Sequence, residues 1–118
     1  MVLAQDKILG HQIIATFKCT DDIINDYNTI KRIFDEAVKT LTVLSNAMYR
    51  FPNSNGVTGF YLIAESHVAY HTWPEYNTIT IDIFTCSTKE VTEQVFNYLL
   101  EHLKPITYTM QYNVRTTL

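Results

Sequence analysis

Hydrophobic positions along the chain follow two periods, and the longer period predicts two amphipathic helices. The first helix is expected at 22–41, where apolar residues recur every three or four positions and so form one stripe. These residues are Ile23, Tyr27, Ile30, Phe34, Ala37 and Leu41. A second stripe predicts a helix at 88–103. Ser87 and Glu90 have the spacing of a capping box there, and Pro105 ends the pattern.

The shorter period predicts strands. At 78–84, isoleucines alternate with Thr80 and Asp82, which is typical of a strand with one buried face. Five further strands are expected at 10–17, 43–51, 59–64, 67–72 and 106–114. The order is strand, helix, four strands, helix, strand, which predicts an α+β two-layer sandwich: a mainly antiparallel sheet with helices on one face. The face of the sheet without helices must then be exposed to solvent, covered by a partner subunit, or used as a binding or active site.

Composition narrows the class of protein. The chain has 118 residues, 47% hydrophobic and 18% charged, which suits a single domain over 1–118. A net charge of −3 argues against a nucleic-acid partner. We expect no membrane span and a cytoplasmic location, because no apolar run approaches ~18 residues and 1–10 lacks the core of a secretory signal. Cys19 and Cys86 are then expected to stay reduced, and without a CxxC pair a structural zinc site is not expected.

The densest cluster of chemically active residues begins at Glu65 and includes Ser66, His67, His71 and Cys86. One interpretation is a strand end whose polar groups satisfy one another. A second is a metal site on the two histidines, disfavoured by strand-like flanks and the lack of a third ligand. A third is nucleophilic catalysis by Ser66 or Cys86 with a histidine as base, although the GxSxG signature of hydrolases is absent. These residues alone leave the three open.

The run ESHVAYHTWPEY at 65–76, followed by DIFTC at 82–86, closely resembles the prokaryotic S-adenosylmethionine decarboxylase proenzymes. The turn at 56–59 and the first strand from Leu9 are similar to the same family, so the resemblance covers roughly residues 9–103. One departure is Thr58, because the family turn usually reads Gly-Val-Ser-Gly.

The resemblance implies self-cleavage. In the family, the hydroxyl matching Ser66 attacks the carbonyl carbon of Glu65, the amide becomes an ester, and β-elimination breaks the chain. The expected products are 1–65 and 66–118, with a covalent pyruvoyl group derived from Ser66 and no metal. His71 matches the family's processing histidine, and Thr58 must supply the hydroxyl that processing needs.

The resemblance also assigns roles in turnover. The pyruvoyl group forms a Schiff base with the substrate amine and accepts the electrons released with carbon dioxide. Cys86 matches the acid that returns a proton to the substrate carbon. Phe51 and Trp73 match aromatic residues that stack on adenine, and Glu75 matches the carboxylate that binds the ribose hydroxyls.

The function implied is decarboxylation of S-adenosylmethionine, to supply the aminopropyl donor for spermidine synthesis, by a homodimer of cleaved protomers. Two alternatives stay open. A pyruvoyl-dependent decarboxylase of arginine or ornithine would carry the same cleavage motif. A non-catalytic regulatory relative would never cleave, but it would have no reason to keep Ser66, His71 and Cys86 together.

Overall fold

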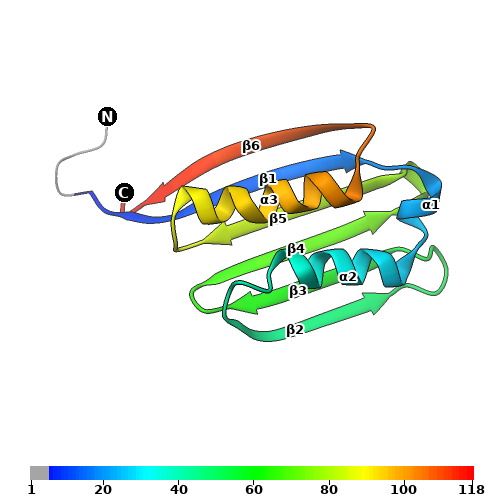
Figure 1. Cartoon of the computed structure of the whole chain (residues 1–118), viewed down its shortest axis with the longest axis horizontal. Coiled ribbons are helices and arrows are strands. Elements are labelled where there is room, and N and C mark those ends of the chain that lie inside the picture. The colour runs from blue at the N-terminus through cyan, green and yellow to red at the C-terminus, as the bar shows by residue number, and fades with distance from the viewer. Residues whose placement is uncertain (1–5) are drawn as a thin grey trace.

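The computed structural model describes residues 6–118, which form one sheet of six strands with the helices on a single face (Figure 1). The strands are β1 (Ile8–Lys18), β2 (Val43–Arg50), β3 (Val57–Ile63), β4 (Ser66–Trp73), β5 (Thr78–Thr85) and β6 (Thr107–Thr116). The helices are α1 (Asp21–Ile24), α2 (Tyr27–Ala37) and α3 (Lys89–Leu103), and a short 3-10 turn η1 spans Pro74–Tyr76. The predicted α+β two-layer sandwich is confirmed.

The strand order is β2-β3-β4-β5-β1-β6, and every neighbouring pair is antiparallel. Strands β2 to β5 form a meander, while the first strand of the chain enters between β5 and the last strand. In Figure 1, α2 lies over β3 and its neighbours, and α3 lies over β1 and β5. Residues 57–86 therefore lie on three neighbouring strands, β3, β4 and β5, and in the turns that join and follow them.

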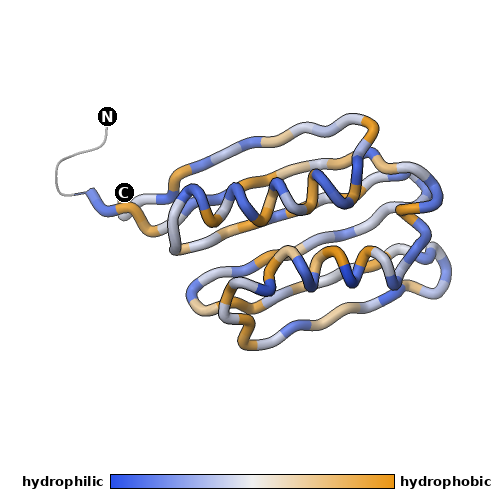
Figure 2. The backbone as a smooth tube through the Cα atoms, viewed as in Figure 1, coloured by the Kyte–Doolittle hydropathy of each residue, from blue (hydrophilic) through white to orange (hydrophobic). Residues whose placement is uncertain are grey.

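The core lies between the sheet and the helices. On β5 the alternation works as predicted, because Ile79, Ile81 and Ile83 are at most 2% exposed. Helices α2 and α3 each bury one stripe of residues, and hydrophobic and hydrophilic residues alternate along both helices (Figure 2). The ring of Phe34 on α2 stacks on Tyr70 of β4 with centroids 3.7 Å apart. Within residues 6–118, no helix is long and apolar enough to cross a membrane.

The predicted first helix is wrong in its boundaries, because the chain breaks it into α1 and α2 and ends α2 at Ala37. The break has a local cause. The carboxylate of Asp26 accepts hydrogen bonds from the backbone N–H of Thr29 at 3.0 Å and from its hydroxyl at 2.7 Å, so Asp26 starts a new helix instead of continuing the old one.

The start of the second helix also differs by one residue. Thr88, not Ser87, is the N-cap of α3, and its hydroxyl oxygen accepts the N–H of Val91 at 3.2 Å. A threonine at this position has the same ability to cap as the serine before it, so the pattern could not separate them.

The second face of the sheet carries no helix over the described residues. Its exposed side chains include several large apolar ones that are between 41% and 44% exposed: Ile14, Phe60, Leu62 and Trp73. Between them lie polar residues such as Thr80 and Asp82. We call this surface the open face.

Candidate active site

Two groups of the predicted site residues lie at opposite ends of β4, and the first surrounds Ser66. A turn of two residues, Ala64 and Glu65, joins β3 to β4, so that Ile63 pairs directly with Ser66. Glu65 has φ of 56°, in the left-handed region that costs a non-glycine residue about 1–2 kcal/mol. The peptide bond expected to break therefore follows directly on a strained residue.

The hydroxyl of Ser66 is held by the residue after β5. The backbone N–H of Cys86 donates to Ser66 Oγ at 3.0 Å, and Ser66 Oγ lies 3.8 Å from Cys86 Sγ. The Cys86 thiol is in turn 4.0 Å from the carbonyl oxygen of Ala64. Ser66 is only 9% exposed, whereas Cys86 is exposed. The antiparallel pairing of β4 with β5 brings together two residues that stand 20 positions apart in the sequence.

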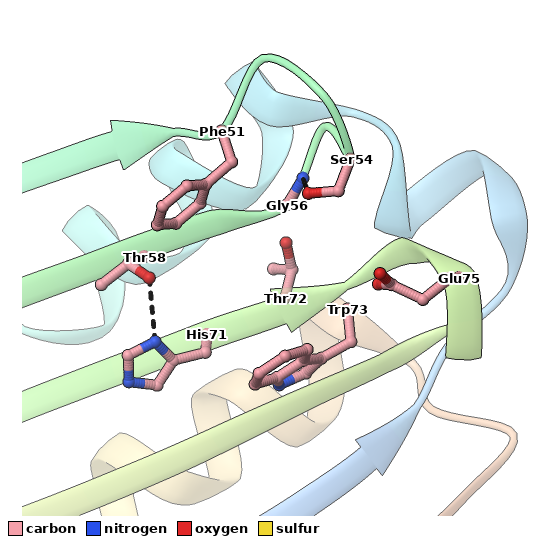
Figure 3. Close-up of a pocket in the computed structure, with 8 residues that line it drawn as sticks. All are labelled: Phe51, Ser54, Gly56, Thr58, His71, Thr72, Trp73 and Glu75. Carbon is pink, nitrogen blue, oxygen red and sulfur yellow. Dashed lines mark hydrogen bonds between the residues drawn. The ribbon is translucent and has the colours of Figure 1, made fainter.

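The second group lines a cavity of about 450 Å³ at the other end of β3 and β4 (Figure 3). Its walls come from the loop after β2, the start of β3, the end of β4 and the turn η1. The lining residues are Phe51, Ser54, Gly56, Thr58, His71, Thr72, Trp73 and Glu75. Five of the positions expected to bind substrate or process the chain, with their neighbours, therefore converge without any contribution from Ser66.

Thr58 and His71 form a pair across β3 and β4. They face each other in the strand register, and Thr58 Oγ1 lies 2.9 Å from His71 Nδ1, the bond dashed in Figure 3. The histidine tautomer decides which of the two atoms donates. Threonine in place of the family's serine thus keeps the hydroxyl contact, with its extra methyl group on an open surface.

The substrate-binding candidates lie beside this pair. Phe51 and Trp73 present aromatic rings that are 46% and 44% exposed, and Glu75 is also exposed. In Figure 3 the two rings flank Thr72, with Glu75 toward η1 and His71 toward the opposite end. Flat apolar faces next to a carboxylate suit a ligand that has a ring and hydrogen-bond donors.

Sequence reasoning missed two lining residues. The hydroxyl oxygen of Ser54 accepts the N–H of Gly56 at 3.1 Å, and that of Thr72 accepts the N–H of Val57 at 2.8 Å. Thr72 belongs to the HTWPE motif, so its position was available as a signal. Ser54 lies in a polar turn without any pattern, and only the fold shows that this turn borders the cavity.

His71 does not reach Ser66 within one chain. The two are five residues apart on β4, which is about 17 Å at ~3.3 Å per residue. They also differ in face, because Ser66 shares the helix-covered side with Val68 and Tyr70 while His71 is on the open face. The expected processing histidine and the residue on which it is expected to act are therefore separated in the protomer.

The remaining candidate ligands of a metal are dispersed. His67 stacks on Phe84 with ring centroids 5.7 Å apart, and its Nε2 lies 3.7 Å from a carboxylate oxygen of Asp82. Over residues 6–118, no three histidine, cysteine, aspartate or glutamate side chains are grouped to hold a metal ion. His67 therefore has a partner on the open face that explains its place without a metal.

Comparison with known proteins decides the family. The sequence profile of the S-adenosylmethionine decarboxylase family matches residues 10–116. The chain belongs to this family. Among curated members of the S-adenosylmethionine decarboxylase family, the proenzyme of Archaeoglobus fulgidus is 40% identical over 103 residues, which cover 86% of this chain and 92% of the relative. The proenzyme of Thermoplasma volcanium is 39% identical over 110 residues, covering 91% and 84%.

A solved structure of the same family has the same fold. The adenosylmethionine decarboxylase of Aquifex aeolicus superposes with a TM-score of 0.84 at 32% identity, covering 92% of each chain. The family resemblance predicted from the ESH, HTWPE and FTC motifs is confirmed. The agreement of fold over nearly the whole chain means that the cluster around Ser66 and the cavity around Trp73 lie on a shared family scaffold.

Proposed function

We propose that this protein is a pyruvoyl-dependent S-adenosylmethionine decarboxylase, made as a proenzyme that cleaves itself between Glu65 and Ser66. The observation that carries the proposal is the Ser66 hydroxyl, held by the N–H of Cys86 directly after a left-handed Glu65, in a chain of this family. In the cell, the product would serve as the aminopropyl donor for spermidine synthesis in the cytoplasm.

Cleavage begins at the Ser66 hydroxyl. Its oxygen bonds to the carbonyl carbon of Glu65 while the bond from that carbon to the Ser66 nitrogen breaks, and the nitrogen ends with the hydroxyl proton. The ester then loses the α proton of residue 66 and its Cβ–O bond, which releases Glu65 as a new carboxylate. The remaining dehydroalanine takes up water and loses ammonia. The left-handed turn favours this sequence because breaking the chain releases its strain.

The residues around Ser66 fit the group that would form there. When bound, a pyruvoyl group supplies a carbonyl that captures the substrate amine and takes up the electrons released with carbon dioxide. The N–H of Cys86, which donates to Ser66 Oγ in the intact chain, would be available after cleavage as a donor to the carbonyl oxygen of that group. The exposed thiol of Cys86, 3.8 Å from Ser66 Oγ, supports the proposal that Cys86 returns a proton to the substrate carbon.

The cavity supplies specificity. Phe51 and Trp73 offer aromatic faces that stack on adenine and attract the sulfonium cation, while Glu75 accepts hydrogen bonds from the ribose hydroxyls. Arginine and ornithine have neither an adenine ring nor a diol, so they would lose the ring stacking and the hydrogen bonds of a diol to Glu75. The cavity of about 450 Å³ lies within the range of small-molecule sites.

A homodimer completes the site. The open face carries Ile14, Phe60 and Leu62 without cover from the described chain, and burying such side chains between two copies is favourable. A two-fold axis that runs across the strands between two facing sheets reverses the strand direction of the second copy. The His71 end of one protomer then lies over the Ser66 end of the other. The separation of His71 from Ser66 within the protomer supports this arrangement.

The test of this proposal is a mass measurement followed by a substrate assay. Purified protein should give two fragments, 1–65 and 66–118, the second beginning with a ketone in place of the amine. Ser66→Ala should remain one chain, and Ser87→Ala, an exposed serine nearby, should cleave like the wild type.

The cleaved protein should release labelled carbon dioxide from S-adenosylmethionine. Release from arginine or ornithine alone would keep the cleavage chemistry and replace the substrate. A chain that never cleaves and never releases carbon dioxide would overturn the proposal in favour of a regulatory relative.

A further inference from the structure

Two buried threonines lie directly behind Cys86. Thr85 is the last residue of β5 and is 1% exposed, and Thr92 in the first turns of α3 is 0% exposed. Their hydroxyl oxygens are 2.8 Å apart. Thr92 Oγ1 also donates to the backbone carbonyl oxygen of Thr88 at 3.0 Å. We call these three residues the threonine clamp.

The direction of both hydrogen bonds follows from the number of protons available. A threonine hydroxyl has one proton, and a carbonyl oxygen can only accept. The hydroxyl of Thr92 must therefore donate its proton to the carbonyl oxygen of Thr88. Its bond to Thr85 is then one in which Thr85 donates and Thr92 accepts. The hydroxyl oxygen of Thr92 on α3 thus binds both Thr85, which precedes Cys86, and Thr88, which follows Ser87.

The clamp fixes both ends of the two-residue segment that carries Cys86. On the strand side, Thr85 is tied to α3 through Thr92. On the helix side, Thr88 is tied through its carbonyl to Thr92 and through its side-chain oxygen to the N–H of Val91 at 3.2 Å. The backbone N–H of Cys86 lies between these anchors and donates to Ser66 Oγ at 3.0 Å.

We propose that Thr92 is a positioning residue for self-cleavage, acting through the Cys86 backbone amide, which it holds against the Ser66 hydroxyl. The inference rests on the cleavage at Glu65-Ser66 proposed above. Neither Thr92 nor Thr85 touches the reacting atoms. The physical basis of the inference is that the rate of attack on a neighbouring carbonyl depends steeply on where the attacking oxygen lies. A misplacement of one ångström reduces such a rate by up to about 10²-fold.

Thr92→Val is the decisive variant, because valine has the shape of threonine and lacks only the hydroxyl. It removes the acceptor of Thr85 and the donor to Thr88 together. We expect the chain made by cell-free synthesis to cleave at least about tenfold more slowly than the wild type. Thr92→Ser keeps the hydroxyl and should cleave within about twofold of the wild-type rate, since the same two hydrogen bonds can form.

A matched control separates positioning from stability. Tyr61 is 4% exposed, and its hydroxyl donates to the carboxylate of Asp35 on α2, outside the threonine clamp. Tyr61→Phe also deletes one buried hydroxyl hydrogen bond, and so should lower the midpoint of urea unfolding without slowing cleavage. In the matured Thr92→Val enzyme we expect kcat for decarboxylation to fall while KM stays unchanged, because the cavity residues do not contact the clamp.

Several outcomes would overturn the inference while leaving the proposed function intact: wild-type cleavage in Thr92→Val, slow cleavage in Thr92→Ser, or equal slowing in Tyr61→Phe. If the wild-type chain itself does not cleave, the proposed function fails instead. Hydrogen exchange of the Cys86 amide in the intact chain then tests the clamp alone. Faster exchange in Thr92→Val than in the wild type supports the clamp, and equal exchange refutes it.

Discussion

The two cysteines of the chain show how the surroundings of a residue set its chemical role. Cys19 is fully buried, and this burial raises the pKa of its thiol to about 11, so it stays protonated and unreactive at neutral pH. Cys86 is exposed at the end of β5, with its sulfur 3.8 Å from Ser66 Oγ. Both are free thiols. Only the second lies beside residue 66, as its proposed role as the proton donor requires.

Replacing Cys86 tests that role. Cys86→Ala keeps the backbone N–H that holds Ser66, so we expect the chain still to cleave. Decarboxylation should fall roughly 10²- to 10⁴-fold, the usual contribution of a positioned acid. Fragment masses and carbon dioxide release measure the two effects separately. Cys19→Ala is the control and should lose some stability but keep its turnover. Decarboxylation at the wild-type rate in Cys86→Ala would show that the thiol takes no part in the reaction.

Glu75 is the residue proposed to bind the ribose hydroxyls of the substrate. Glu75→Gln keeps the shape of the side chain but weakens its acceptance of two ribose O–H groups. A loss of roughly 1–3 kcal/mol corresponds to a KM for S-adenosylmethionine about 5- to 150-fold higher. Self-cleavage should be unchanged because the attack of the Ser66 hydroxyl on the Glu65 carbonyl involves no ribose hydroxyls, which are the groups that Glu75 is proposed to bind. Steady-state kinetics measures this, with the exposed Glu90→Gln as control, and an unchanged KM would remove Glu75 from the site.

At the scale of elements, the hairpin of β3 and β4 depends on a close approach at Gly59. A Cβ atom there would lie 2.1 Å from the ring of Tyr70 on the neighbouring strand. That ring cannot move away easily, because it is 1% exposed and stacks on Phe34 of α2. Glycine therefore lets an aromatic ring cover the strand and join the hairpin to the helix layer.

We expect Gly59→Ala to destabilise the protein by about 1–3 kcal/mol, the usual range for overpacking a core. Urea unfolding followed by circular dichroism measures this change. The shorter side chain of Tyr70→Leu makes room for the new methyl group, so the double variant should be more stable than the sum of the two single effects predicts. Strict additivity would show that the strain arises elsewhere.

At the scale of the whole molecule, the sheet divides its functional residues between two ends. Ser66 and Cys86 lie at one end, while Thr58, His71 and the cavity lie at the other. If Ser66 is the nucleophile and His71 the processing histidine, their separation of about 17 Å along β4 predicts that a protomer is incomplete by itself. The exposed apolar side chains of the open face give a physical reason for two copies to associate.

Mixing two inactive variants tests this division. Light scattering should give about twice the chain mass. Ser66→Ala and His71→Ala chains should each remain uncleaved alone, yet the His71→Ala chain should cleave when co-expressed with Ser66→Ala. In the mixed dimer, the strand end that carries an intact His71 in one copy lies over the strand end that carries an intact Ser66 in the other, so one of two sites is complete. A fully active monomer, or no cleavage in the mixture, would contradict the dimer.

The sequence alone was sufficient to predict the elements and the family. Period-two alternation at Ile79, Ile81 and Ile83 reflects a sheet with one buried face, and such local patterns survive folding because burial is their cause. The ordered motifs at 65–76 and 82–86 were specific enough to indicate the chemistry. Helix ends were predicted less well, because Asp26 and Thr88 act through single hydrogen bonds that hydrophobic periodicity does not register.

Only the tertiary structure decided which of the candidate residues meet. Ser66 and Cys86 come together through strand pairing across 20 positions, and Thr92 on α3 contacts Thr85, the residue before Cys86. His71, five residues from Ser66 in the sequence, is far from it in space, because an extended strand separates its residues by length and alternates their faces. The motif could therefore be recognised from residues that are neighbours along the chain. The geometry of the sheet determined which of these residues lie together, at the Ser66 end or at the cavity.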